Sequence, residues 1–276
     1  MNISIYRGGN MRSAIKNGQI IREDEALIPI TARAVQFSFS VYEALRITKG
    51  HVVHLDDHLA RLRESADTIN LKLCQSDEEI EKSLEKLIEC DNIVDATVRI
   101  LAIGGDCENI FITYHDLLTY PDSYYENGIT CTTYHGERFL PYAKTSNLLM
   151  SYIALESAKS IGCFEALLVN RNGCITEGTR SNFYAIKGNT LYTAGDEDVL
   201  SGITRMSVLR AAKELGMDVV FECPKAEDVY SYDGVFISST SMAAMPIAAI
   251  DGREVSQKAH SLILKISALV RKWEFD

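Results

Sequence analysis

The chain has 276 residues, a formal net charge of −10 and seven cysteines. This acidic balance has no compensating basic run, so it disfavours nucleic acids and anionic membrane surfaces as partners. No stretch approaches the roughly 20 apolar residues that span a bilayer, and residues 1–10 lack the apolar core of a secretory signal. The cysteines form no CxxC pair, so neither a disulfide framework nor a thiolate metal site is predicted, and we expect reduced, buried thiols. We therefore expect a cytoplasmic protein that acts on small molecules.

The first half of the chain is predicted to combine helices and strands. Residues 41–47 and 51–55 predict a hairpin around Gly50, and apolar residues at helical spacing predict helices over about 55–69 and 77–89. Residues 96–103 and 109–117 then predict paired strands. The turn-rich segment at Tyr120 marks a boundary. It divides the chain into an N-terminal α/β domain, 1–120, and a C-terminal α/β domain, 121–276.

The second half repeats this mixture. Strands are expected at 128–134, 166–169, 174–177 and 234–238, and helices at about 147–161, from Gly202 to before Gly216, and at about 255–272. The turn before residue 174 places Glu177 at a strand end. The predicted fold class is mixed α/β with antiparallel strand pairing.

Residues able to carry chemistry stand in four short segments. Lys144 precedes a predicted helix, Glu177 ends a strand, and the other two segments are Gly202–Arg205 and Ser238–Thr240. An isolated lysine or strand-end glutamate is most often a solvated surface group. The order and spacing of these segments, behind the blocks Val41–Arg46 and His54–Leu62, form a specific combination.

With these motifs the chain resembles, over nearly its whole length, the class IV (fold-type IV) enzymes that use pyridoxal 5'-phosphate (PLP). That family contains branched-chain aminotransferases, D-amino-acid aminotransferases and 4-amino-4-deoxychorismate lyase. The resemblance implies a two-domain fold like that of D-amino-acid aminotransferase, with PLP between the domains, and a homodimer. The residues themselves predict only two mixed halves and a cleft at their junction.

The resemblance also implies roles for single residues. Lys144 matches the lysine that forms a Schiff base with the cofactor and moves the substrate proton. Glu177 matches the carboxylate that faces the pyridine nitrogen. Three kinds of group are assigned to the phosphate of the cofactor. They are the Arg46 guanidinium, the backbone amides of Ile203 and Thr204 at a helix start, and the hydroxyl-bearing residues Ser239 and Thr240.

Further arginines are candidates beside this core set. Arg180, Arg99 and Arg33 could each bind a substrate carboxylate. Arg138 could neighbour the phenolic oxygen of the cofactor. His54 and His58 stand four residues apart, but no third ligand is spaced to complete a metal site, so no metal is predicted.

The leading hypothesis is a PLP-dependent aminotransferase that moves an amino group between an amino acid and a 2-oxo acid. D-amino acids are slightly favoured, and branched-chain L-amino acids remain open. A 4-amino-4-deoxychorismate lyase, which would release pyruvate without a 2-oxo acid acceptor, is the second hypothesis. A catalytically silent relative that only binds PLP or a protein partner is the third.

Overall fold

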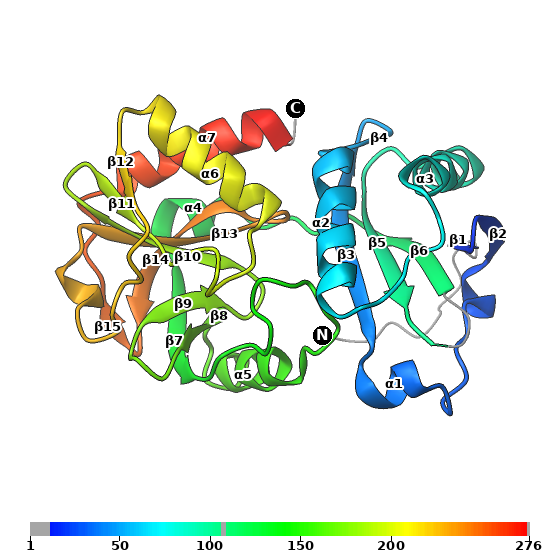
Figure 1. The fold of residues 1–276 in the computed structure, drawn as a ribbon. Helices are drawn as coiled ribbons and strands as arrows, with labels where there is room; N and C mark the ends of the chain where they lie inside the picture. Colours follow the sequence, from blue (N-terminus) through cyan, green and yellow to red (C-terminus); the bar gives the residue numbers. More distant parts are fainter. Residues whose placement is uncertain (1–11, 106–108, 275–276) are drawn as a thin grey trace.

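The chain folds into two lobes, each built on its own β-sheet (Figure 1). The computed structural model describes residues 12–105 and 109–274. The last strand of the first sheet ends at His115, and the next helix begins at Ser123. The predicted boundary at residue 120 falls in this interval. Within the described ranges, no helix is both long and apolar enough to cross a membrane.

The smaller lobe contains a six-stranded sheet in which all neighbouring strands are antiparallel. Its spatial order is β2-β1-β6-β5-β3-β4. The strands are β1 (Ser13–Lys16), β2 (Gln19–Arg22), β3 (Ser40–Thr48), β4 (His51–Val52), β5 (Ala96–Ile103) and β6 (Asn109–His115). Two short helical segments, η1 (Glu23–Glu25) and α1 (Arg33–Phe37), lie between β2 and β3.

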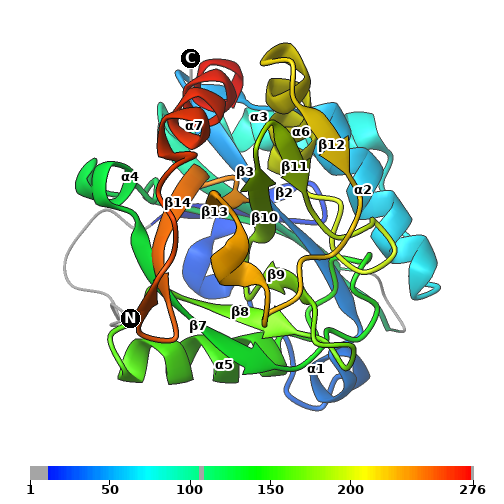
Figure 2. The ribbon, with the colours of Figure 1, turned by 90° about the vertical axis from the view of Figure 1, so that its left-hand side faces the viewer.

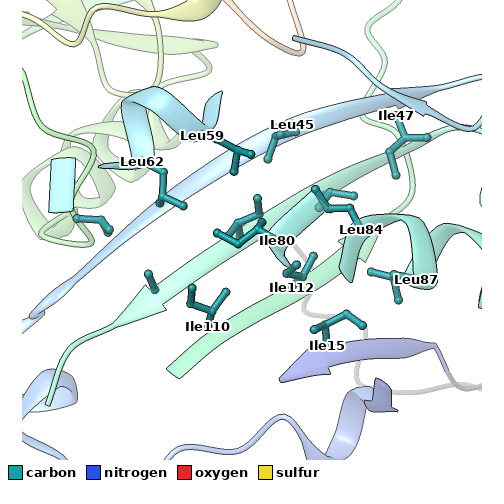
Figure 3. Close-up of a cluster of buried hydrophobic side chains, with 14 of the residues drawn as sticks. Ile15, Leu45, Ile47, Leu59, Leu62, Ile80, Leu84, Leu87, Ile110 and Ile112 are labelled. Carbon is teal, nitrogen blue, oxygen red and sulfur yellow. The ribbon is translucent and has the colours of Figure 1, made fainter. Parts of the chain in front are cut away.

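Helices α2 (Leu55–Thr68) and α3 (Asp77–Asp91) cover one face of this sheet (Figure 3). A capping box starts α3, because Ser76 Oγ accepts from the Glu79 amide and a Glu79 carboxylate oxygen accepts from the Ser76 amide. Leu59 and Leu62 of α2 are almost fully buried. The edge of β3 contacts the larger lobe through an isolated bridge between Val41 and Thr145.

The larger lobe contains nine strands, and it mixes parallel with antiparallel pairs. The strands are β7 (Ile129–His135), β8 (Glu165–Val169), β9 (Ile175–Gly178), β10 (Asn182–Lys187), β11 (Thr190–Tyr192), β12 (Asp218–Val220), β13 (Gly234–Ser239), β14 (Ala243–Ile250) and β15 (Arg253–Glu254). The pair Asn182–Glu177 joins β10 to β9 and closes a ring through β13, β14, β7 and β8. Glu177 therefore sits at the closure of this ring.

Four helices and one short helical turn complete the larger lobe. They are α4 (Ser123–Asn127), α5 (Leu149–Ser160), α6 (Ile203–Glu214), η2 (Val229–Ser231) and α7 (His260–Glu274). Figure 2 shows α6 and α7 at one end of the lobe and α5 at the other, with the strands between them. The first turn of α6 points toward the smaller lobe, because its residues Ile203 and Thr204 line a cavity together with Arg46 of β3.

The structure corrects several predicted details. β4 ends at Val52 rather than at residue 55, because His54 has a left-handed backbone with φ of 52° and begins α2. The last helix begins at His260, since residues 253–254 form β15 against β14. Parallel pairing of β7 with β8 and β14 was not predicted. Cys74 and Cys90 are exposed thiols.

Candidate active site

Lys144 lies in the loop between β7 and α5, and the smaller lobe holds that loop in place. The Tyr42 amide donates to the Lys144 carbonyl at 3.1 Å, and the Ser146 amide donates to the Ser40 carbonyl at 3.0 Å. The Lys144 amide donates to Ser65 Oγ of α2 at 3.0 Å. Backbone on both sides of the lysine is thus fixed by β3 and α2, although the lysine belongs to the second half of the chain.

The side chain of Lys144 points into the space between the lobes. Its Nζ lies 4.7 Å from the centre of the Tyr42 ring. Burial lowers the pKa of Lys144, and the positive charges of Arg61 and Arg138 act in the same direction, while Tyr42 and Glu43 oppose them. A lowered pKa increases the neutral fraction of the amine, which is the form that acts as a nucleophile or base.

A cavity of about 260 Å³ surrounds Lys144 at the junction of the two sheets. Eight of the ten residues predicted for the site line it: Lys144, Glu177, Arg46, Ile203, Thr204, Ser239, Thr240 and Arg180. These residues are contributed by β3, β9, α6 and β13 and by the loops beside them. The fold therefore gathers segments up to 194 residues apart (from 46 to 240) around one amine.

One end of the cavity is acidic. Glu177 is 5% exposed, and its Oε1 accepts a hydrogen bond from Arg138 Nε at 2.7 Å. The Leu200 amide approaches the other oxygen at 3.5 Å. Burial raises the pKa of Glu177, and the charge and hydrogen bond of Arg138 only partly offset this. A further positive group in the cavity would stabilise the carboxylate in its charged form.

Another part of the cavity wall suits an anion. Helix α6 begins at Ile203, and its first amides face the cavity with the positive end of the helix dipole. Thr204, Ser239 and Thr240 line the wall beside them. Arg46 of β3 lines it from the smaller lobe and donates from Nε to Thr48 Oγ1 at 3.0 Å.

Arg61 of α2 also lines the cavity, although it was not among the predicted site residues. Its Nε and Nη2 donate to the two oxygens of Glu43 at 2.8 and 2.6 Å, and its Nη1 donates to the Ser201 carbonyl at 3.1 Å. Ser201 precedes the start of α6, so Arg61 connects the smaller lobe to the anion-binding part of the wall. His58 Nδ1 lies 2.7 Å from Glu43 Oε2. The only available signal was the position of Arg61 inside the recognised block His54–Leu62.

The three candidate substrate arginines have different surroundings. Arg180 lines the cavity with a side chain that is 39% exposed, and its Nε lies 3.5 Å from Glu165. Arg99 stacks on the Tyr42 ring at 4.3 Å, next to the cavity but not among its lining residues. Arg33 begins α1, is exposed and lies over Phe37, so it does not line the cavity either. The geometry separates Arg180 from the other two.

His58 is committed to the buried Glu43. Among the described residues, no group of three or more histidines, cysteines, aspartates or glutamates is arranged to hold a metal ion. Cys107 lies outside the described residues.

Comparison with known proteins places the chain in a family. The model of the amino-transferase class IV family matches residues 40–250. The chain is 31% identical over 261 residues to a D-alanine aminotransferase of Bacillus licheniformis, covering 90% of this chain and 92% of that protein. It is 32% identical over 250 residues to the Rickettsia felis protein named "Probable branched-chain-amino-acid aminotransferase", covering 85% and 86%. The chain belongs to the class IV aminotransferases.

The fold agrees with this assignment. The branched-chain amino acid aminotransferase of Escherichia coli superposes with a TM-score of 0.84 at 25% identity, covering 92% of this chain and 93% of that one. The predicted fold-type IV architecture is confirmed. Class IV aminotransferases are PLP-dependent, so the chain is a PLP-dependent transaminase whose partners are amino acids and 2-oxo acids.

The residues of the cavity fit PLP. An amine with a lowered pKa lines one cavity together with a buried carboxylate, which lacks a second strong donor in the described structure, and the amino end of a helix. These three features match the aldehyde, the ring nitrogen and the phosphate of the cofactor.

Proposed function

We propose that the enzyme transaminates D-amino acids and 2-oxo acids with Lys144 as the catalytic residue. The observation that carries this proposal is that Lys144 lines one cavity together with Glu177 and the start of α6. Glu177 would face the ring nitrogen of PLP. Ile203, Thr204, Ser239, Thr240 and Arg46 would hold the phosphate, and Arg61 would contribute a second guanidinium beside them.

When bound, PLP supplies an electron sink for the negative charge that develops at the substrate α-carbon. Lys144 Nζ would take the proton from that carbon and deliver it to the cofactor carbon bonded to the same nitrogen, which requires the neutral amine that burial favours. Arg138 holds the Glu177 carboxylate in one orientation through its Nε. A negative Glu177 would keep the ring nitrogen of bound PLP protonated and so maintain its capacity to accept electrons.

The preference for D-amino acids is supported by the 31% identity to a D-alanine aminotransferase. A preference for dicarboxylates among them is supported by Arg180, whose guanidinium reaches the cavity wall and could bind a second carboxylate. Branched-chain L-amino acids are the second candidate. Leu117, Leu118 and Leu148 line the same cavity and would accept an apolar side chain.

A cytoplasmic homodimer is part of the proposal. Five large apolar side chains are exposed on α5 and the loop before it: Phe139, Tyr142, Leu149, Tyr152 and Ile153. Exposed apolar groups gathered in this way favour burial against a second copy. The six cysteines that the structure describes are all free thiols, which suits a reducing compartment. Light scattering across a range of protein concentrations tests the dimer.

Visible absorbance tests the activity. The PLP-loaded protein is expected to absorb as a lysine Schiff base, and D-alanine or D-glutamate is expected to convert that band, with recovery on adding a 2-oxo acid. L-leucine and L-glutamate are the matched comparison, and conversion by L-leucine alone would favour the second candidate. Lys144→Ala should show neither the band nor turnover. Pyruvate release from 4-amino-4-deoxychorismate without an acceptor would support the lyase instead.

A further inference from the structure

A buried carboxylate lies behind the anion-binding part of the cavity wall. Glu274 of α7 is 3% exposed, and its Oε2 accepts a hydrogen bond from Thr204 Oγ1 at 3.1 Å. Its other oxygen, Oε1, is buried and has no hydrogen-bond partner among the described residues. Nothing in the proposed function explains a carboxylate here, because the same wall is proposed to hold a phosphate.

A second, much smaller void connects Glu274 to that wall. The void has a volume of about 10 Å³, and Glu274 lines it together with Arg46, Ile203, Thr204 and Thr240. The last four residues also line the large cavity. Glu274 and a phosphate in the cavity would therefore approach the same arginine and the same helix start from opposite sides.

Two anions that share one cation oppose each other. The charge of Arg46 favours ionised Glu274, and a bound phosphate would draw on the same charge and the same amides of α6. Burial raises the pKa of Glu274 to about 7, although hydrogen bonds from Ser207 and Thr204 and the charge of Arg46 act against this. The carboxylate is thus close to its protonation midpoint before any phosphate is bound.

Other titratable groups face this region from the surrounding elements. His54 and His58, at the start of α2, line the small void, and Glu43 occupies His58 Nδ1. Tyr184 of β10 is influenced by the charge of Glu274. On α7 itself, the Arg271 guanidinium lies over the Tyr125 ring of α4 at 4.0 Å. Arg46 is the cation whose charge acts on Glu274.

We propose that Glu274 is a positioning residue for the phosphate-binding wall, and that it carries a proton whenever the phosphate of the cofactor is bound. In that state Thr204 Oγ1 stays anchored to Glu274, while the charge of Arg46 is left to the phosphate. Cofactor binding then takes up a proton near neutral pH, and the affinity for the cofactor weakens as the pH rises through 7. This inference rests on the proposed function, because it takes the phosphate to bind at the start of α6.

Pyridoxamine 5'-phosphate is the suitable probe, because it forms no Schiff base with Lys144. Calorimetric titration of the cofactor-free full chain at pH 7.5, in two buffers of different ionisation enthalpy, counts the protons exchanged on binding. The wild type should take up a larger fraction of a proton than Glu274→Gln. Between about pH 7 and pH 8, the dissociation constant should rise up to about tenfold in the wild type relative to the Gln variant, as one linked proton requires.

The comparison of variants separates this role from a structural one. Protonation of the probe itself contributes equally to both proteins and cancels. Glu274→Asp retains a carboxylate and should keep the excess proton uptake, and it is the variant to measure if Glu274→Gln does not fold. Equal proton uptake and equal pH dependence in the wild type and Glu274→Gln would overturn the inference. If pyridoxamine 5'-phosphate binds to none of the proteins, the proposed function fails, and this inference fails with it.

Discussion

Two buried glutamate–arginine pairs lie beside the same lysine, and they differ in how completely the carboxylate is satisfied. Glu43 accepts two bonds from Arg61, at 2.8 and 2.6 Å, and lies 2.7 Å from His58 Nδ1. Glu177 accepts one close bond, from Arg138 at 2.7 Å, and a marginal one from the Leu200 amide at 3.5 Å. Both carboxylates are at most 5% exposed.

The charge states differ accordingly. Burial raises the pKa of each carboxyl group, but the bonds from Arg61 and His58 outweigh burial and lower the pKa of Glu43 to about 2. At Glu177 burial prevails over Arg138, and the pKa is raised. Glu43 is therefore a permanently charged anchor between β3 and α2. The positive charge of Arg138 alone does not offset the burial of Glu177. This is expected of a carboxylate whose second positive partner is the ring nitrogen of a cofactor.

Removing the charge of Glu177 tests this contrast most strongly. Glu177→Gln should lower kcat by about 10²-fold or more, because a neutral amide no longer keeps the ring nitrogen protonated, while the melting temperature changes little. Steady-state transamination and thermal unfolding measure the two effects. Glu177→Asp, which keeps the charge, should retain more activity than Gln. Equal kcat in wild type and Gln variant would remove Glu177 from the catalytic machinery.

Removing the charge of Glu43 should reduce stability more than activity. Glu43→Gln leaves Arg61 buried beside a neutral group, so the free energy of unfolding should fall by about 3 kcal/mol. Urea denaturation measures it, and the kcat of the folded fraction should change less than in Glu177→Gln. The double variant Glu43→Gln with Arg61→Met is the control, and it should recover part of the stability. A larger loss in the double variant than the sum of the single losses would contradict the pairing.

The sequence predicts a site role for Glu177, but it does not predict the pairing of Glu43 with Arg61. Glu177 was placed through its motif and its strand end, and the structure puts it in the cavity with Lys144. Glu43 and Arg61 stood inside recognised blocks, but their pairing joins β3 to α2 and depends on how the helix packs on the sheet. Arg138 comes from a loop without periodicity, so its bond to Glu177 could not be read from spacing.

Elements of the fold with a local sequence signal were predictable, and pairings between distant segments were not. Helices such as α3 have a local capping box and apolar spacing, and their limits were nearly correct. Parallel pairing of β7 with β8 and β14 has no local signal, since the paired residues Cys131–Glu165 and Ile129–Ile247 are 34 and 118 residues apart in the sequence. Arg33 was placed near the site by sequence order alone, and α1 turns it to the surface.

The pH dependence of stability should separate the two carboxylates by sign in the cofactor-free protein. The stabilisation from Glu43 is complete above its ordinary pKa of 4.5 and is lost as the pH falls toward about 2. Glu177 has a raised pKa, so the folded state holds a proton that the unfolded state releases, and its stability contribution declines as the pH rises above 4.5. Urea denaturation of each Gln variant and the wild type from pH 3.5 to about 8 checks both slopes.

In that series, the deficit of Glu43→Gln relative to wild type should shrink as the pH falls below 4.5. Glu177→Gln should gain on wild type as the pH rises above the same value. Adding pyridoxamine 5'-phosphate should reduce the second trend, because the ring nitrogen supplies the missing positive charge. Slopes of the same sign for both residues would show that their environments do not differ in the way described.

A third pair, Glu165 with Arg180, extends the comparison to a contact that is looser still. The Arg180 Nε lies 3.5 Å from Glu165, and Thr179 and Ser181 also donate to that carboxylate, so Glu165 does not depend on the arginine alone. Arg180 can therefore leave Glu165 for a substrate carboxylate at modest cost. Arg180→Met should raise the KM for D-glutamate by about tenfold, the effect of roughly 1.4 kcal/mol, and leave the KM for D-alanine nearly unchanged.

Steady-state kinetics with both substrates measures this difference, and Arg180→Lys is the matched control. Lysine keeps the charge but not the two-pronged geometry, so it should restore only part of the affinity for D-glutamate. An equal rise in KM for both substrates would mean that Arg180 shapes the loop after β9 through Glu165 rather than binding the second carboxylate. The Glu165–Arg180 pair would then have a structural role, like the Glu43–Arg61 pair. Of the three pairs, only Glu177–Arg138 would take part in catalysis.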